Sequence, residues 1–127
     1  MAPQDADFSD EFCRFLQAAM PAVEAAELLL AARRDETRWW TLGELIASGI
    51  AVREEDAARY VEGLQASGLV ALDAERRLQY RAAEPLAAHV ATLEKVYRER
   101  PVTLIRVIYG LRDSKIRSFA DAFKLRK

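Results

Sequence analysis

Apolar residues recur at helical spacing through the first third of the chain. Ser9, followed by the acidic residues Asp10 and Glu11, has the pattern of a helix N-terminus. An apolar stripe runs along this segment and contains Phe8, Phe12, Phe15, Leu16 and Ala19. Strong helix formers fill residues 21–34, so a second helix is predicted there, beginning at Pro21.

The middle of the chain predicts two helices joined by a turn. Thr41 and Glu44 have the spacing of a capping box, so a helix is expected to begin at Leu42 and to end at Gly49. A longer helix is predicted over residues 53–67, closed by Gly68. Its apolar residues recur at i, i+3, i+4 and i+7, and they are Ala57, Tyr60, Val61 and Leu64.

The pattern then changes from helical to alternating. Apolar and polar residues alternate on both sides of the polar sequence DAER, with the apolar positions at Val70, Leu72, Leu78, Tyr80 and Ala82. This predicts a two-stranded hairpin. Its connection is expected to have four or five residues, because the sequence lacks the Asn-Gly or Asp-Gly of a two-residue turn. A very short strand is also expected at residues 39–40.

Helices are predicted again in the C-terminal third. One begins at Pro85 and ends by Arg100. The segment VTLIRVIYGL, residues 102–111, is apolar on nearly every side, so it is expected to be buried or shared between subunits. A separate amphipathic helix, capped by Ser114, is predicted for SKIRSFADAFKLRK, residues 114–127.

This order of elements resembles the winged helix–turn–helix superfamily of small bacterial transcription regulators. The resemblance is carried by the sequences TLGEL, DAARYVEGL and ASGLV, and it covers about residues 21–84. It implies a mostly α fold with a small β-hairpin, in which a winged helix–turn–helix is flanked by N-terminal and C-terminal helices. The expected divisions are an N-terminal helix in residues 1–20, a winged core in 21–84 and a helical extension in 85–127.

The resemblance implies a transcriptional regulator that binds double-stranded DNA through the 53–67 helix and the 69–82 wing. The candidate DNA contacts are Arg59, Arg76, Arg77 and Arg81. However, the same helix begins with Glu54, Glu55 and Asp56. Acids in a first turn complement the helix dipole, by about 0.3–1 kcal/mol each, but they also repel phosphates. The alternative is a winged-helix adaptor that binds another protein and no DNA.

Charge is divided unevenly along the 127 residues, whose formal net charge is −1. Residues 1–93 hold 9 Lys and Arg against 16 Asp and Glu, a balance of −7. Residues 94–127 hold 10 against 4, a balance of +6. The cationic third is expected either to meet an anionic partner or to dock on the acidic remainder of the protein.

No pattern in the sequence indicates catalysis, a cofactor or a metal. His89 is the single histidine, so a site built from several histidines is excluded, and Cys13, the single cysteine, has no His or Cys at ligand spacing. Phosphate-binding glycine motifs are absent. We therefore expect a protein that is not an enzyme. A cytoplasmic location is also expected, because the sequence has one cysteine, no signal-peptide pattern and no apolar run long enough to cross a membrane.

The outer helices carry more apolar residues than a small winged core is expected to cover. Exposed apolar patches commonly mark interfaces, so a homodimer is predicted. Its expected interface residues are Phe8, Phe12, Phe15, Ile105, Ile108, Phe119 and Phe123.

Overall fold

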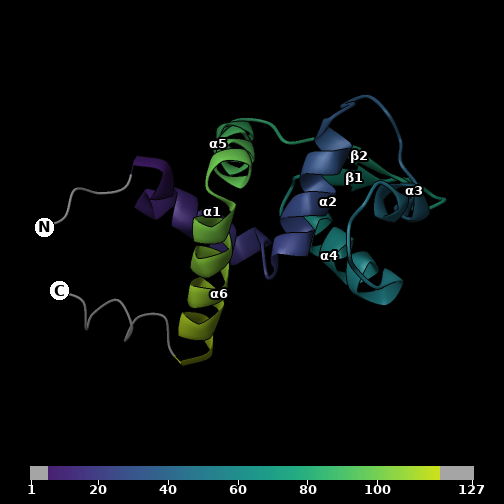
Figure 1. Ribbon diagram of the computed structural model, residues 1–127. Helices are drawn as coiled ribbons and strands as arrows, with labels where there is room; N and C mark the ends of the chain where they lie inside the picture. Colours follow the sequence, from purple (N-terminus) through teal and green to yellow (C-terminus); the bar gives the residue numbers. More distant parts are fainter. Residues whose placement is uncertain (1–5, 118–127) are drawn as a thin grey trace, which may run out of the picture.

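The computed structural model describes residues 6–117 and confirms a mostly α fold with one small hairpin (Figure 1). A short 3₁₀ turn, η1, precedes the first helix. The elements are, in chain order, η1 (Ala6–Phe8), α1 (Asp10–Ala19), α2 (Val23–Arg33), α3 (Leu42–Ala47), α4 (Glu54–Ala66), β1 (Val70–Leu72), β2 (Leu78–Tyr80), α5 (Leu86–Glu99) and α6 (Pro101–Arg117).

The helix α2 lies at the centre of the fold (Figure 1). It contacts α3, α4 and β2 as well as α5. A helix that is apolar on most sides must be buried on most sides, and the buried residues of α2 are Ala25, Ala26, Leu28, Leu29, Ala31 and Ala32. Four of these six are alanines, whose small side chains allow neighbouring elements to approach closely.

The predicted boundaries around α3 and α4 are confirmed. The backbone N–H of Glu44 donates to Thr41 Oγ1 at 3.1 Å, and the backbone N–H of Thr41 donates to Glu44 Oε1 at 2.9 Å, which completes the capping box. Gly49 follows α3 with a φ of 118°. Arg53 precedes α4 and provides no side-chain cap, so the acids of the first turn are left to complement the helix dipole.

The hairpin is antiparallel and pairs Val70 with Tyr80 and Leu72 with Leu78. Residues 73–77 connect its strands, and this five-residue connection lies within the expected four or five residues. Trp40 forms an isolated antiparallel bridge with Leu78, through two backbone hydrogen bonds of 2.8 Å. Trp40 therefore lies where the very short strand was expected.

The helices α1, α5 and α6 pack against one another. Phe12, Phe15 and Leu16 of α1 are buried where α1 meets α5 and α6, and Leu104, Ile108 and Leu111 form the buried stripe of α6. Phe12, Phe15 and Ile108 are therefore core residues of a single chain, which corrects their assignment to a dimer interface. The apolar surface expected to need a second subunit is largely covered by the chain's own helices.

The other expected interface residues have different positions. Phe8 is half-buried and packs against the same core, whereas Ile105 is 39% exposed. Phe119 and Phe123 lie outside the described residues. Homodimerisation itself stays a prediction.

The C-terminal helices differ from the expectation in their boundaries. The structure has one continuous helix, α6, from Pro101 to Arg117, so Ser114 lies inside a helix and does not begin one. Pro101 begins α6 because proline favours the first helical position, where its missing N–H is not needed. Gly110 does not break the helix, and a Cβ added there would meet nothing within 4 Å.

Among residues 6–117, no single helix combines the length and apolar character needed to cross a membrane. Within the described part of the chain, one pair of helices, α1 and α2, reaches that length and composition together, and this pair is bent by 96° at the break between its helices.

Gly68 provides a test of the junction between α4 and the hairpin. Its φ is +81°, and an added Cβ would lie 3.6 Å from Leu86 Cδ1, an ordinary contact. The strain of Gly68→Ala is therefore in the backbone, and the variant should lower the free energy of unfolding by about 1 kcal/mol.

The matched control is Gly63→Ala within α4. Gly63 has no positive φ, and its added Cβ would meet nothing within 4 Å. This variant should raise the free energy of unfolding by about 0.5–1 kcal/mol. Urea titration compares the two variants, and effects of the same sign would contradict the assigned backbone conformation.

Candidate functional site

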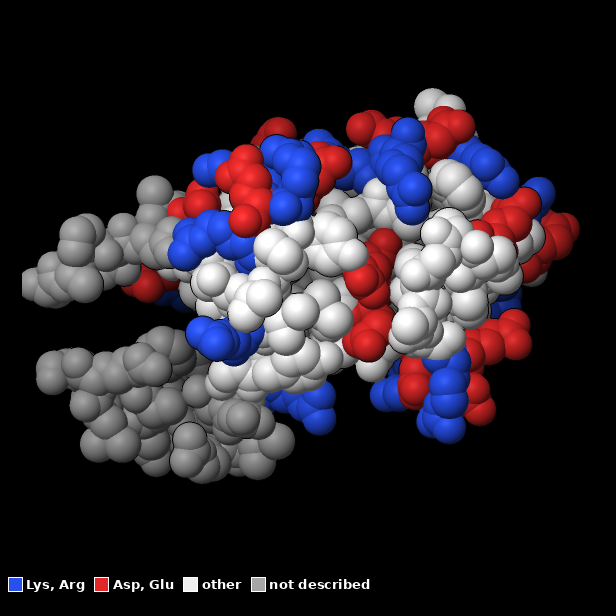
Figure 2. All heavy atoms as spheres, in the orientation of Figure 1, with Lys and Arg blue, Asp and Glu red and all other residues white. Residues whose placement is uncertain are grey.

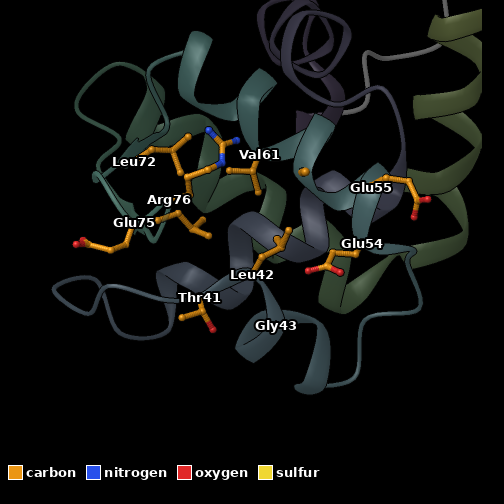
Figure 3. Close-up of a pocket in the computed structure, with 11 residues that line it drawn as sticks. Thr41, Leu42, Gly43, Glu54, Glu55, Val61, Leu72, Glu75 and Arg76 are labelled. Atoms are coloured by element: carbon orange, nitrogen blue, oxygen red, sulfur yellow. The ribbon is translucent and has the colours of Figure 1, made fainter.

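A groove opens where α3, α4 and the hairpin meet (Figure 3). Its volume is about 560 Å³, within the range of sites that accept small molecules or side chains, about 300–1,000 Å³. The lining residues are Thr41, Leu42, Gly43, Glu54, Glu55, Ala58, Val61, Leu72, Glu75, Arg76 and Leu78. Figure 3 shows the hairpin residues on one side and the start of α4 on the other, with the start of α3 between them.

The groove combines an apolar floor with an acidic rim. Val61 and Leu78 are buried, and Leu42 and Leu72 are half-buried beside them. The charged residues of the lining are three acids and one arginine, which give it a formal charge of −2. In Figure 3 the carboxylate of Glu54 points into the groove, whereas those of Glu55 and Glu75 point outward at its two ends. Sequence reasoning identified Glu54 and Glu55 but neither Glu75 nor the cavity, because the floor of the cavity comes from α3, α4 and the hairpin.

Arg59, the expected DNA contact of α4, is paired with an acid of its own helix. Its guanidinium donates a hydrogen bond to Asp56, and Arg53 donates to the same carboxylate at 3.3 Å. These bonds, that from Arg59 first, hold the pKa of Asp56 below its ordinary value of 3.8. The positive charge of Arg59 is therefore largely balanced within α4.

The arginines of the hairpin loop, Arg76 and Arg77, are likewise paired with acids. Asp73 organises the loop, since its Oδ1 accepts the backbone N–H groups of Glu75 at 3.0 Å and Arg77 at 2.8 Å. Arg77 Nε also donates to Asp73 Oδ2, at 2.7 Å. Arg76, which has a φ of 64°, donates from its guanidinium to Glu62 of α4 at 3.2 Å. The loop thus directs both arginines toward carboxylates of the protein.

Arg81, the last expected DNA contact, lies at the base of the wing. Its Nε donates to the side-chain oxygen of Gln79, and its guanidinium lies over the Trp39 ring, 5.6 Å from the ring centroid. The structure therefore does not gather the four expected arginines into a cationic patch. Residues 41–82 carry five arginines against seven acids, a balance of −2. On the face seen in Figure 2, basic and acidic side chains alternate around the end of the molecule where α3 and the hairpin lie.

A second cavity of about 400 Å³ lies between α2, the turn after α3 and α5. Tyr97 donates its hydroxyl to Glu27 Oε2 at 2.7 Å, and this bond, with burial, raises the pKa of Tyr97 to about 12. Arg34 and Arg98 also line the cavity, with Leu30 and Ile50 as apolar residues. Its mixture of charges and apolar groups indicates no particular ligand.

The two candidate reactive side chains have structural surroundings. Cys13 is half-buried, and burial raises the pKa of its thiol, which makes it a poor nucleophile. The His89 ring stacks on Phe15 with centroids 5.3 Å apart. No cluster of three His, Cys, Asp or Glu residues that could hold a metal occurs within residues 6–117.

Comparisons with known proteins provide no family for this chain: no family model matches it, and no match was found among curated proteins or solved structures.

The pairing of Arg59 with Asp56 can be tested by NMR titration of the carboxyl groups. The pKa of Asp56 is lowered on folding, so its stabilising effect is fully present above about pH 3.8 and is lost as the pH falls through the lower folded-state pKa. Arg59→Ala should raise the pKa of Asp56 toward its ordinary value. Arg76→Ala removes a guanidinium that is paired with Glu62, so it should leave Asp56 unchanged. An Asp56 titration unaffected by Arg59→Ala would mean that Arg59 is free to bind elsewhere.

Proposed function

We propose that this protein is a winged-helix adaptor, which binds a basic segment of another protein in the groove between α3, α4 and the hairpin. The observation that carries the proposal is the acidic rim around an apolar floor, with Glu54 directed inward. A partner segment that presents an apolar side chain flanked by Lys or Arg matches this surface in shape and in charge.

The arrangement of charge supports an adaptor better than a DNA reader. Phosphate binding is driven by the release of counterions when protein cations replace them. Arg59, Arg76 and Arg77 are each paired with an acid of the same chain, so a DNA phosphate would have to displace a carboxylate. The Glu54 and Glu55 carboxylates would remain beside any phosphate placed on the start of α4.

DNA binding in transcriptional regulation remains the second candidate. It is favoured by the order of α2, α3, α4 and the hairpin, which matches the winged helix–turn–helix order implied by the sequence resemblance. On this hypothesis Arg59, Arg76, Arg77 and Arg81 supply the contacts. Exposed ion pairs stabilise a protein by only about 0–1 kcal/mol each, so they can exchange partners.

A pair of binding measurements distinguishes the two functions. Fluorescence anisotropy with a synthetic amphipathic peptide of Lys and Leu should show micromolar binding that weakens as salt is added. A gel shift with random duplex DNA at low ionic strength, where electrostatic binding is strongest, should show no complex with the wild-type protein. Duplex binding without peptide binding would overturn the adaptor proposal.

A steric variant assigns peptide binding to the groove. Ala58 lines the groove from α4, and Ala58→Leu fills part of the space without changing charge or helix propensity appreciably. It should weaken peptide binding about tenfold or more. The matched control is Ala87→Leu, because Ala87 is a half-buried residue of α5 that does not line the groove. Equal affinities for the two variants would place the peptide elsewhere.

A further inference from the structure

We propose that the basic C-terminal segment of a second copy of this chain, residues 118–127, occupies the acidic groove. This inference rests on the proposed function, since it assigns a partner to the same groove. Two copies would each insert this segment into the other's groove, so that the exchange closes as a symmetric dimer.

The chemistry of the segment complements the groove. Residues 118–127 carry Lys124, Arg126 and Lys127 against Asp121, a balance of +2, while the groove lining has a balance of −2. Phe119 and Phe123 are four positions apart, so on a helix they lie on one face. An aromatic side chain on the apolar floor, with cations near the rim acids, satisfies both parts of the surface.

The apolar floor has room for such an anchor. Leu42 and Leu72 are half-buried beside the buried Val61 and Leu78, and the volume above them is about 560 Å³. Aromatic residues that fill apolar pockets commonly carry a large share of binding energy. Glu54, whose carboxylate points into the groove, lies where it can pair with a cation that follows the aromatic residue.

The position of α6 favours exchange between copies. α6 packs against α1 and α5, whereas the groove is built from α3, α4 and the hairpin. Figure 1 shows the end of α6 on the opposite side of α2 from α3 and the hairpin. The helix α6 thus ends on the side away from the groove of its own chain.

The experiment uses two variants of the full-length chain, one with the charge of residues 118–127 reversed and the other with the charge of the groove reversed. One variant carries Lys124→Glu with Arg126→Glu, and the other carries Glu54→Lys with Glu75→Lys. Sedimentation equilibrium at micromolar concentration should show a dimer for the wild type. Each variant alone should dissociate about tenfold or more readily, because like charges then face each other. A one-to-one mixture should form a heterodimer, because both of its segment–groove contacts again join opposite charges.

Two further variants serve as controls. Glu36→Lys with Glu84→Lys makes the same charge change at exposed acids that do not line the groove, and it should remain dimeric. Phe123→Ala removes the aromatic anchor without altering charge, and it should also weaken the dimer about tenfold. Melting curves of all variants establish that loss of the dimer is not loss of the fold.

Three results would overturn this inference. They are a monomeric wild type, a dimer that resists charge reversal in the segment, and a mixture that fails to form the heterodimer. A monomer whose own segment fills its groove falls under the first of these. In each case, binding of the synthetic peptide of Lys and Leu tests the proposed function separately. If the peptide binds and Ala58→Leu weakens it, the groove is a protein-binding site with a different partner. If the peptide binds neither the wild type nor the Lys124→Glu, Arg126→Glu variant, whose own segment no longer matches the groove in charge, both proposals fail.

Discussion

Burial of α2 on most of its sides is the constraint on which the rest of the structure depends. Its alanines and leucines can be removed from water only if elements pack around it, and α3, α4 and β2 do so together with α5. The part formed by α3, α4 and the hairpin is therefore joined to the outer helices α1, α5 and α6 through one shared core. This explains why the outer helices extend the core and why Phe12, Phe15 and Ile108 are covered within a single chain.

The groove depends on that core for its position and on local hydrogen bonds for its shape. The capping box of Thr41 and Glu44 fixes the start of α3, and Asp73 fixes the hairpin loop by accepting two backbone N–H groups. Arg76 then joins the loop to α4 through Glu62. Acids thus have two uses in this region: several set local geometry, while Glu54 is directed into the cavity. Because both uses accumulate negative charge, the groove is acidic although the chain as a whole is nearly neutral.

Local signals in the sequence predicted much of the fold. The capping box, the glycines after α3 and α4, and the alternation of Val70 and Leu72 each depend on residues close together in the chain, and the structure confirms them. The Ser114 prediction was wrong because a serine followed by an amphipathic pattern also occurs inside a helix, and only the uninterrupted backbone of α6 decides between them. The sequence could not predict which acid pairs with Arg76, since Glu62 is fourteen residues away and is brought close by the folded hairpin. The groove was missed for the same reason, because its floor joins Leu42, Val61 and Leu78 from three elements.

The distribution of charge connects the groove to the rest of the molecule. Exposed ion pairs add only about 0–1 kcal/mol each to stability. The pairing of Arg76 and Arg77 with acids therefore matters mainly because it reduces the positive charge that the hairpin loop presents to a partner. The part of the chain from α3 to the hairpin has a formal charge of −2, because residues 41–82 hold seven acids against five arginines. Residues 94–127 hold ten basic residues against four acids. This uneven distribution of charge along the chain supports the proposed contact between residues 118–127 of one copy and the groove of another. The proposed contact would join unlike charges, whereas a phosphate backbone at the start of α4 would meet the carboxylates of Glu54 and Glu55. Both effects would weaken as salt screens the charges.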